Sequence, residues 1–226
     1  MDIRLHYTEQ GAGEPLVLLH GNGESGNYFS HQMDYFSRFC RVIAVDTRGH
    51  GQSPRGDAPF TIRQFADDLL EFLDGLGIER VRLLGFSDGG NTALVFALRH
   101  PERVARLVLN GANLNAGGVK PSVQIPIALG YRMASLAARW SAAGRKNAEM
   151  LGLMVNDPNI DPEELAALHV RTLVIAGTRD MILRAHTRLL YESLPDADLV
   201  FVEGDHFVAD KNPEAFNRAV EAFLRE

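Results

Sequence analysis

The sequence contains a single cysteine, Cys40, among its 226 residues. One cysteine cannot form an intramolecular disulfide, so the fold must depend on a packed core rather than on a disulfide framework. A reducing compartment suits such a sequence, and we expect a cytoplasmic location. The N-terminal residues contain no long apolar run, and the sequence therefore predicts no secretory signal peptide.

Long apolar runs and clusters of positive charge are also missing. No stretch approaches the roughly 18 apolar residues that a membrane-spanning helix needs, so we expect no membrane partner. The formal net charge is −6, and no run is rich in lysine or arginine, which argues against a nucleic-acid partner. Hydrophobic residues make up 46% of the chain and charged residues 23%, as is usual for a globular enzyme. Nothing in the sequence fixes the oligomeric state.

Short apolar runs alternate with longer amphipathic stretches along most of the chain. Six of the runs are nearly continuous in apolar residues, as in strands buried on both faces: 16–19, 42–45, 81–86, 107–109, 172–176 and 199–202. Four stretches have helical periodicity: 61–75, 89–100, 183–194 and 213–224. Residues 3–7 alternate with a period of two and predict an edge strand. The pattern predicts an α/β fold with a mainly parallel, doubly wound sheet.

One long segment interrupts this alternation. After the strand expected at 107–109, the next convincing core strand begins only at residue 172, and an amphipathic stretch runs from Ile127 to Met154. The intervening segment is too long for an ordinary connection between a strand and a helix. We predict a small helical cap at residues 112–165, inserted into a core of residues 1–111 and 166–226. The alternative is an ordinary crossover helix with long loops.

The segment Gly85-Phe86-Ser87-Asp88-Gly89 matches the motif G-x-S-x-G. It directly follows an apolar run and opens a helical stretch, which is the context that a nucleophile elbow requires. Glycines on both sides suit a sharp, strained turn because they have no Cβ to collide with neighbouring backbone. We therefore predict Ser87 as a catalytic nucleophile. The alternative is a serine that only caps the helix.

A serine nucleophile needs a base, and the chain offers eight histidines. Only His206 follows the last expected strand on a short turn, which favours it as the general base. The carboxylate that orients the histidine should come from another strand end, and Asp180 follows the strand expected at 172–176. The alternatives are a surface histidine at 206 and an aspartate at 180 that caps the next helix.

Acyl transfer also needs two backbone N–H groups directed at the developing oxyanion. One is expected from Asp88, immediately after the nucleophile and at a helix N-terminus. The other is expected from the turn His20-Gly21-Asn22-Gly23, at Asn22. Asn22 and the three triad candidates all follow the carboxyl ends of predicted strands. In an open parallel sheet those ends lie along one edge, where ligands bind.

A competing motif lies in the same turn. Gly21-Asn22-Gly23-Glu24-Ser25-Gly26 matches G-x-G-x-x-G, and Asp46 follows it about 20 residues later, as in dinucleotide-binding folds. A nicotinamide-dependent oxidoreductase is therefore the rival from another chemical class, but it gives the predicted triad no role. A non-catalytic binding protein on the same scaffold would be expected to lack at least one triad residue, and none is missing.

Taken together, these motifs resemble the α/β-hydrolase superfamily along the whole chain except the cap. The resemblance rests on His20-Gly21, residues 46–53, Gly85-Phe86-Ser87-Asp88-Gly89-Gly90, Asp180 and Gly204-Asp205-His206. It implies a Ser-His-Asp triad, no metal, no organic cofactor, and a purely structural turn at residues 46–53. Serine at the elbow departs from haloalkane dehalogenases and epoxide hydrolases, whose nucleophile is aspartate.

Within the superfamily, Ser87-Asp88-Gly89-Gly90 and Asn110-Gly111-Ala112-Asn113 are similar to the valacyclovir-hydrolase branch, which cleaves α-amino-acid esters. This likeness implies that the Asp88 carboxylate binds a substrate ammonium through a charge-assisted hydrogen bond. The alternative is that Asp88 only caps its helix or interacts with the helix dipole. The sequence thus predicts a serine hydrolase of small carboxylic esters. Cleavage of lactones, thioesters, amides or C–C bonds, and perhydrolysis, are alternatives on the same triad.

Overall fold

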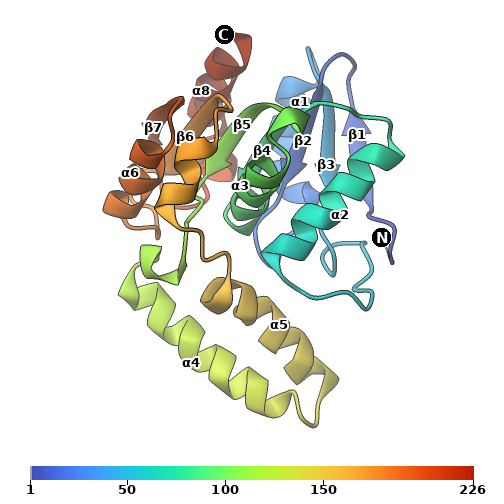
Figure 1. Ribbon diagram of the computed structural model, residues 1–226, viewed down its shortest axis with the longest axis vertical. Coiled ribbons are helices and arrows are strands. Elements are labelled where there is room, and N and C mark those ends of the chain that lie inside the picture. Colours follow the sequence, from blue (N-terminus) through green and yellow to red (C-terminus); the bar gives the residue numbers. More distant parts are fainter. Residues whose placement is uncertain (1) are drawn as a thin grey trace.

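A computed structural model of the protein describes residues 2–226. Within these residues the centre of the molecule is a seven-stranded sheet with the order β1-β3-β2-β4-β5-β6-β7 (Figure 1). The strands are β1 (Tyr7–Gln10), β2 (Pro15–Leu19), β3 (Arg41–Val45), β4 (Val81–Phe86), β5 (Val104–Asn110), β6 (Thr172–Gly177) and β7 (Ala197–Val202). Strand β1 pairs antiparallel with β3, and the other described pairs are parallel. The predicted mainly parallel α/β sheet is confirmed.

The edge strand begins later than the sequence predicts. We expected it at residues 3–7, whereas β1 pairs with β3 from Tyr7 to Gln10. The alternation at residues 3–7 has a different cause, because Leu5 is buried in the core before the strand begins. The residues of β1 are largely exposed, as an edge strand permits, so they carry no apolar pattern.

Helices cover both faces of the sheet (Figure 1). One apolar cluster joins the sheet to α2 (Ile62–Gly75), α3 (Asp88–Arg99) and α6 (Arg184–Ser193). A second cluster joins the opposite face to α1 (Ser30–Phe36) and α8 (Pro213–Arg225). Strand β2 contributes Val17 and Leu19 to the first cluster and Leu16 and Leu18 to the second. A strand that is buried on both faces in this way reads as a continuous apolar run.

Four short helical segments complete the core and its connections. They are η1 (Gly26–Phe29), η2 (Pro101–Arg103), η4 (Pro162–Ala167) and α7 (Val208–Lys211). A further turn, η3 (Ala116–Gly118), leads from β5 towards the interrupted region of the sequence. Among residues 2–226, no helix is both long and apolar enough to cross a membrane.

The segment between β5 and β6 forms two helices, α4 (Pro121–Ala137) and α5 (Ala142–Asn156), which run antiparallel below the sheet (Figure 1). The sequence indicates one amphipathic stretch here and does not reveal the turn at residues 138–141. That turn is favoured by Ser141, whose hydroxyl accepts a hydrogen bond from the Gly144 N–H and caps α5. We call α4 and α5 the cap helices. The domain boundaries predicted for the cap, residues 112–165, stay a prediction.

Candidate active site

Ser87 occupies a sharp turn between β4 and α3. Its backbone angles are φ 53° and ψ −120°, a strained conformation for a residue with a side chain. The Ser87 N–H donates to the Asn110 carbonyl at 2.8 Å, and the Ser87 carbonyl accepts from the Asn91 N–H at 2.9 Å. These bonds to β5 and α3 hold the turn in place. The Ser87 side chain is thereby presented, half-buried, beyond the carboxyl end of the central strand.

The glycines on both sides of the turn are needed because backbone segments meet there. A Cβ on Gly85 would lie 2.2 Å from the Gly89 carbonyl oxygen. A Cβ on Gly89 would lie 2.0 Å from the carbonyl oxygen of Leu19 in β2. No side chain fits at such distances, so the glycines of the motif permit close packing of the elbow against the sheet.

The structure brings Ser87, His206 and Asp180 into one hydrogen-bonded chain. The Ser87 Oγ lies 3.0 Å from His206 Nε2, and His206 Nδ1 lies 2.6 Å from Asp180 Oδ1. The histidine is 4% exposed and the aspartate 5%, so water competes little for these bonds. Because the carboxylate accepts from Nδ1, Nε2 is left free to accept the serine proton. This is the tautomer that a general base requires.

Asp180 is itself held by backbone donors. Its Oδ1 also accepts from the Ile182 N–H at 2.9 Å, and its Oδ2 accepts from the Gly177 N–H at 3.3 Å. Both donors lie at or just beyond the end of β6, so the strand fixes where the carboxylate points. The predicted alternative, in which Asp180 only caps the next helix, does not account for its contact with His206.

Gly111 supports the histidine in a way that the sequence analysis missed. It follows β5 with φ +61°, and a Cβ there would lie 2.8 Å from His206 Cε1. On another side, the Phe86 ring lies 4.8 Å from the His206 ring, measured between centroids. Glycine at 111 therefore leaves the space that the imidazole occupies. One signal in the sequence could have indicated this role: Gly111 directly follows a buried strand, where a positive φ or a close contact often requires glycine.

The turn that holds Asn22 is fixed by a buried histidine. The Thr47 N–H donates to His20 Nε2 at 3.1 Å, so His20 Nδ1 carries the proton and donates to the Gly21 carbonyl at 2.7 Å. Burial lowers the pKa of His20 to about 4, which keeps the ring neutral near pH 7. The Asn22 side chain donates to the Met150 carbonyl of α5 at 2.7 Å. The turn is thus tied to a cap helix, which the sequence could not indicate.

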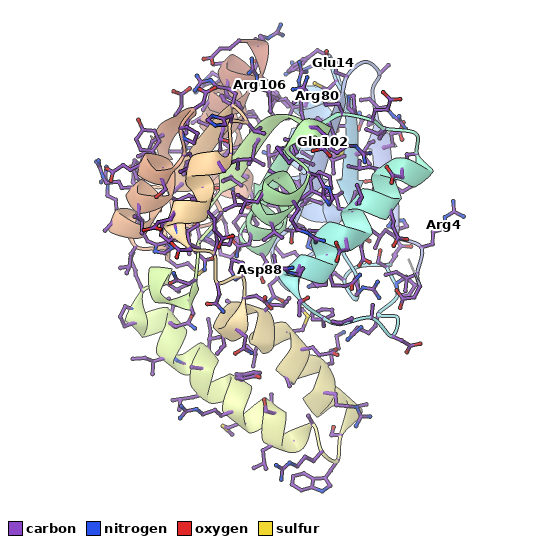
Figure 2. The ribbon with its side chains drawn as sticks, in the orientation of Figure 1. Arg4, Glu14, Arg80, Asp88, Glu102 and Arg106 are labelled. Atoms are coloured by element: carbon purple, nitrogen blue, oxygen red, sulfur yellow. The ribbon has the colours of Figure 1, made fainter. Side chains whose placement is uncertain are left out.

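Asp88 lies at the start of α3, on the side of the core that faces the cap helices (Figure 2). Its Oδ1 accepts from the Asn91 side chain at 3.3 Å, whereas its Oδ2 is buried without a hydrogen-bond partner among residues 2–226. Burial, helped by the charge of Asp157, raises the pKa of Asp88 to about 6 against the opposing effect of the Asn22 and Asn91 amides. Near pH 7 most molecules therefore carry a buried carboxylate at Asp88, one residue after Ser87 in the chain.

Two further polar side chains near the site were missed by the sequence analysis. Glu24 Oε2 and the Tyr28 hydroxyl are buried without a hydrogen-bond partner among the described residues. Burial raises the pKa of Glu24 to about 7, against the opposing effect of a hydrogen bond with the Gly21 backbone. The Tyr28 ring stacks on Phe86 at 4.5 Å between centroids. Both residues follow the glycine-rich turn, where no periodic pattern marks which side chains point inwards.

The competing dinucleotide motif lacks the features it needs. The Asp46 carboxylate accepts from the Gly26 N–H at 2.7 Å and the Gln52 N–H at 2.9 Å, and its Oδ2 also lies 2.9 Å from His6 Nδ1. These contacts leave it poorly placed to bind a ribose hydroxyl. Asp46 instead stabilises the turn at residues 46–53. Within the part of the chain that the structure describes, no cluster of acidic, histidine or cysteine side chains is arranged to hold a metal.

Comparison with known proteins gives matches along nearly the whole chain. Residues 14–143 match the family described as the alpha/beta hydrolase fold. The chain is 33% identical to a 2-hydroxymuconate semialdehyde hydrolase from Pseudomonas putida, over 99% of this chain and 91% of that protein. The enol-lactonase from Burkholderia xenovorans LB400 has a similar structure, with a TM-score of 0.83, 27% identity, and coverage of 99% of this chain and 97% of that one. A hydrolase from Pseudomonas aeruginosa PA01 gives a TM-score of 0.80 at 29% identity, covering 98% and 94%.

Proposed function

Because this chain belongs to the α/β-hydrolase family and is a hydrolase, we propose that it cleaves small carboxylic esters through an acyl-enzyme intermediate. The observation that carries the proposal is the hydrogen-bonded chain from Ser87 through His206 to Asp180. Such a chain allows a weakly acidic hydroxyl to act as a nucleophile near neutral pH. No step of this chemistry draws on a metal or an organic cofactor.

In the proposed reaction the Ser87 oxygen attacks the acyl carbon while His206 Nε2 accepts the serine proton. The tetrahedral intermediate collapses, and His206 gives that proton to the leaving alcohol. A water molecule then attacks the acyl-enzyme, His206 accepts its proton, and the serine oxygen leaves and is reprotonated. Asp180 keeps the imidazole in the required tautomer throughout. The backbone N–H groups of Asn22 and Asp88 are the proposed donors to the oxyanion in both steps.

The proposed substrate class is esters with a free α-amino group. Support comes from Asp88, which has a buried carboxylate oxygen without a partner one residue from the nucleophile. It lies with His20, Asn22 and Leu153 of α5 around a gap that is too small to hold a water molecule in this structure. The proposal therefore requires α5 to move away from the core when substrate binds, so that a substrate ammonium can supply the missing hydrogen-bond donor and a compensating charge.

Lactones are the second candidate substrates. The likeness to an enol-lactonase favours them, and opening a lactone is ester cleavage in which the leaving alcohol stays attached. The chain is also similar to a 2-hydroxymuconate semialdehyde hydrolase, so C–C bond hydrolysis should be tested alongside ester and lactone cleavage. Activity should therefore be profiled on matched linear esters, on lactones and on 2-hydroxymuconate semialdehyde.

The decisive experiment replaces Ser87 with alanine. We expect turnover of a small activated ester to fall by several orders of magnitude with the fold intact, because removing a triad member typically costs that much in kcat. An organophosphonate should label wild-type protein at Ser87 alone. Retention of more than about a tenth of the wild-type rate would contradict a nucleophilic role, since triad losses are far larger.

A further inference from the structure

The outer side of the α4 cap helix carries a continuous stripe of exposed apolar side chains. Four lie on α4 and the last in the turn that follows it: Ile125, Leu129, Met133, Leu136 and Trp140. They are spaced three or four residues apart, which places them on one side of a helix. Met133 is 74% exposed and Trp140 76% exposed. Apart from Leu189, these are the exposed large hydrophobic residues among residues 2–226.

This stripe is not accounted for by packing within the molecule. Helix α4 contains no buried residue at all, and its other side rests on α5, where Tyr131 approaches Gly152. A helix in a globular protein normally turns its apolar side towards a core. Contiguous apolar surface of this kind instead marks a site of interaction with another molecule or a membrane.

The charge around the stripe indicates what the partner is. Residues 116–148 contain five cations and no aspartate or glutamate, although the whole chain has a net charge of −6. The cations are Lys120, Arg132, Arg139, Arg145 and Lys146. Arg132 and Arg139 are exposed beside the stripe, and within residues 2–226 neither forms a salt bridge. The surface therefore combines an apolar stripe with unpaired positive charge.

A second copy of the chain fits this surface poorly. In a symmetric dimer through α4, the same patch would face itself, so the arginines of the two copies would approach one another. The segment offers no carboxylate to separate them. An anionic lipid surface supplies both an apolar layer for the stripe and negative headgroups for the cations. Tryptophan at the end of the stripe is also typical of the boundary between lipid and water.

We propose that the outer face of α4 docks on an anionic membrane surface, with the helix lying in the plane of that surface. The sequence predicts no membrane partner because no apolar run could span a bilayer, but a helix lying on the surface needs no such run. The turn between the cap helices lies at the end of the molecule farthest from the body of the sheet (Figure 1). Docking there would leave the core clear of the membrane and accessible from solution.

The test is sedimentation of the full-length protein with vesicles at low ionic strength. We expect binding to vesicles of phosphatidylserine and phosphatidylcholine in equal parts, and binding at least about tenfold weaker to phosphatidylcholine alone. Added salt should weaken binding to the anionic vesicles, because at about 0.1 M ionic strength charges more than about 10 Å apart are largely screened. No binding to the anionic vesicles, or equal binding to both kinds, would overturn the proposal.

Two double variants and one control test whether the stripe is the surface that binds the vesicles. Met133→Gln combined with Trp140→Gln should weaken vesicle binding by about tenfold or more, because both apolar side chains leave the lipid. Arg132→Gln combined with Arg139→Gln should do the same through charge. Leu189→Gln, at an exposed apolar residue of α6, is the matched control and should bind like wild type. All variants should hydrolyse a water-soluble ester at the wild-type rate.

Two outcomes would count against the lipid surface. Stripe variants that bind vesicles as well as wild type would separate membrane binding from α4. The second outcome is that wild-type protein dimerises in solution and does not bind vesicles, and that the variant with Met133 and Trp140 replaced is a monomer. That result would assign the stripe to a second copy of the chain. If the apolar double variant failed to fold, the arginine variant would still decide between these results, because its exposed side chains form no salt bridge in the described fold.

Discussion

The buried carboxylate of Asp88 should lower the stability of the protein above about pH 6, and Asp88→Asn should remove that cost. Burial raises the pKa of Asp88 from 3.8 to about 6. As pH rises through 3.8, the unfolded chain loses this proton while the folded protein keeps it, so the free energy of unfolding falls. Above about pH 6 both states are ionised and the cost stays constant.

The size of this effect follows from the shift. A difference of about 2 pKa units corresponds to about 3 kcal/mol, since each unit is worth about 1.4 kcal/mol. The side chain is nearly fully buried, so solvent screening removes little of this. Asparagine has nearly the same shape and no charge. The stability of Asp88→Asn relative to wild type should therefore increase by about 2.5 kcal/mol between pH 4 and pH 8, because a small part of the cost is already present at pH 4.

Urea unfolding at intervals of one pH unit measures this difference directly, provided that the slope against urea stays the same in both proteins. Asp205→Asn is the matched control, because Lys211 lowers the pKa of that carboxyl instead of raising it. For Asp205→Asn the stability relative to wild type should change little between pH 4 and pH 8, because a carboxyl whose pKa is lowered below 3.8 is ionised in both the folded and the unfolded state over most of that range. A stability difference for Asp88→Asn that is flat from pH 4 to pH 8, or greatest at low pH, would refute the reasoning.

The same variant tests the substrate proposal, because Asp88→Asn keeps the backbone N–H and removes only the charge. Wild type should favour esters with a free α-amino group over their N-acetylated counterparts by roughly ten- to a hundredfold in kcat/KM, as a charge-assisted hydrogen bond implies. The variant should lose that preference and still cleave neutral esters. Equal losses on charged and neutral esters would instead give Asp88 a purely structural role at the elbow.

Two other substitutions probe groups that hold the site in place. Arg48→Met should destabilise the fold by about 3–5 kcal/mol in urea unfolding, because it leaves the buried Asp68 carboxylate without its bidentate partner. Adding Asp68→Leu should restore much of that loss, and a double variant as unstable as the single one would contradict this origin. Gly111→Ala should lower kcat by about a hundredfold with little change in KM, since its Cβ would displace the His206 ring. Gly77→Ala shares a positive φ but has open space around its Cβ, so it should lose stability only, and an equal loss of kcat in both would refute the displacement.

Much of the fold and the candidate site could be predicted because both depend on local patterns. Strands buried on two faces read as apolar runs, and the chain leaves a parallel sheet at one edge after every such run. Ser87, Asp180 and His206 each follow a run of this kind, so their proximity could be expected before their distances were known. The glycines of the elbow were predictable for the same reason, since they belong to one short turn.

Contacts between distant segments were not predictable, because the hydrophobic pattern of a sequence does not indicate which distant residues will meet. Asn22 donates to a carbonyl 128 residues away, and Arg48 is buried between Asp68 and Asp2. In the sequence, Arg48 looks like one more surface charge in a turn, and only its buried position in the fold gives it a role. Each such residue acts through a partner whose place is set by the whole topology.

The apolar pattern of the cap also could not be interpreted fully from the sequence. The apolar residues of α4 have a regular helical spacing, and that spacing normally indicates a side packed against a core. The helical spacing of the apolar residues shows that they lie on one side of α4. It does not show whether another part of the protein packs against that side. In this chain the sheet and its five covering helices already enclose two apolar clusters, so the stripe is left over. An amphipathic pattern in a sequence therefore predicts that a surface will be covered, and only the fold reveals whether the protein itself covers it.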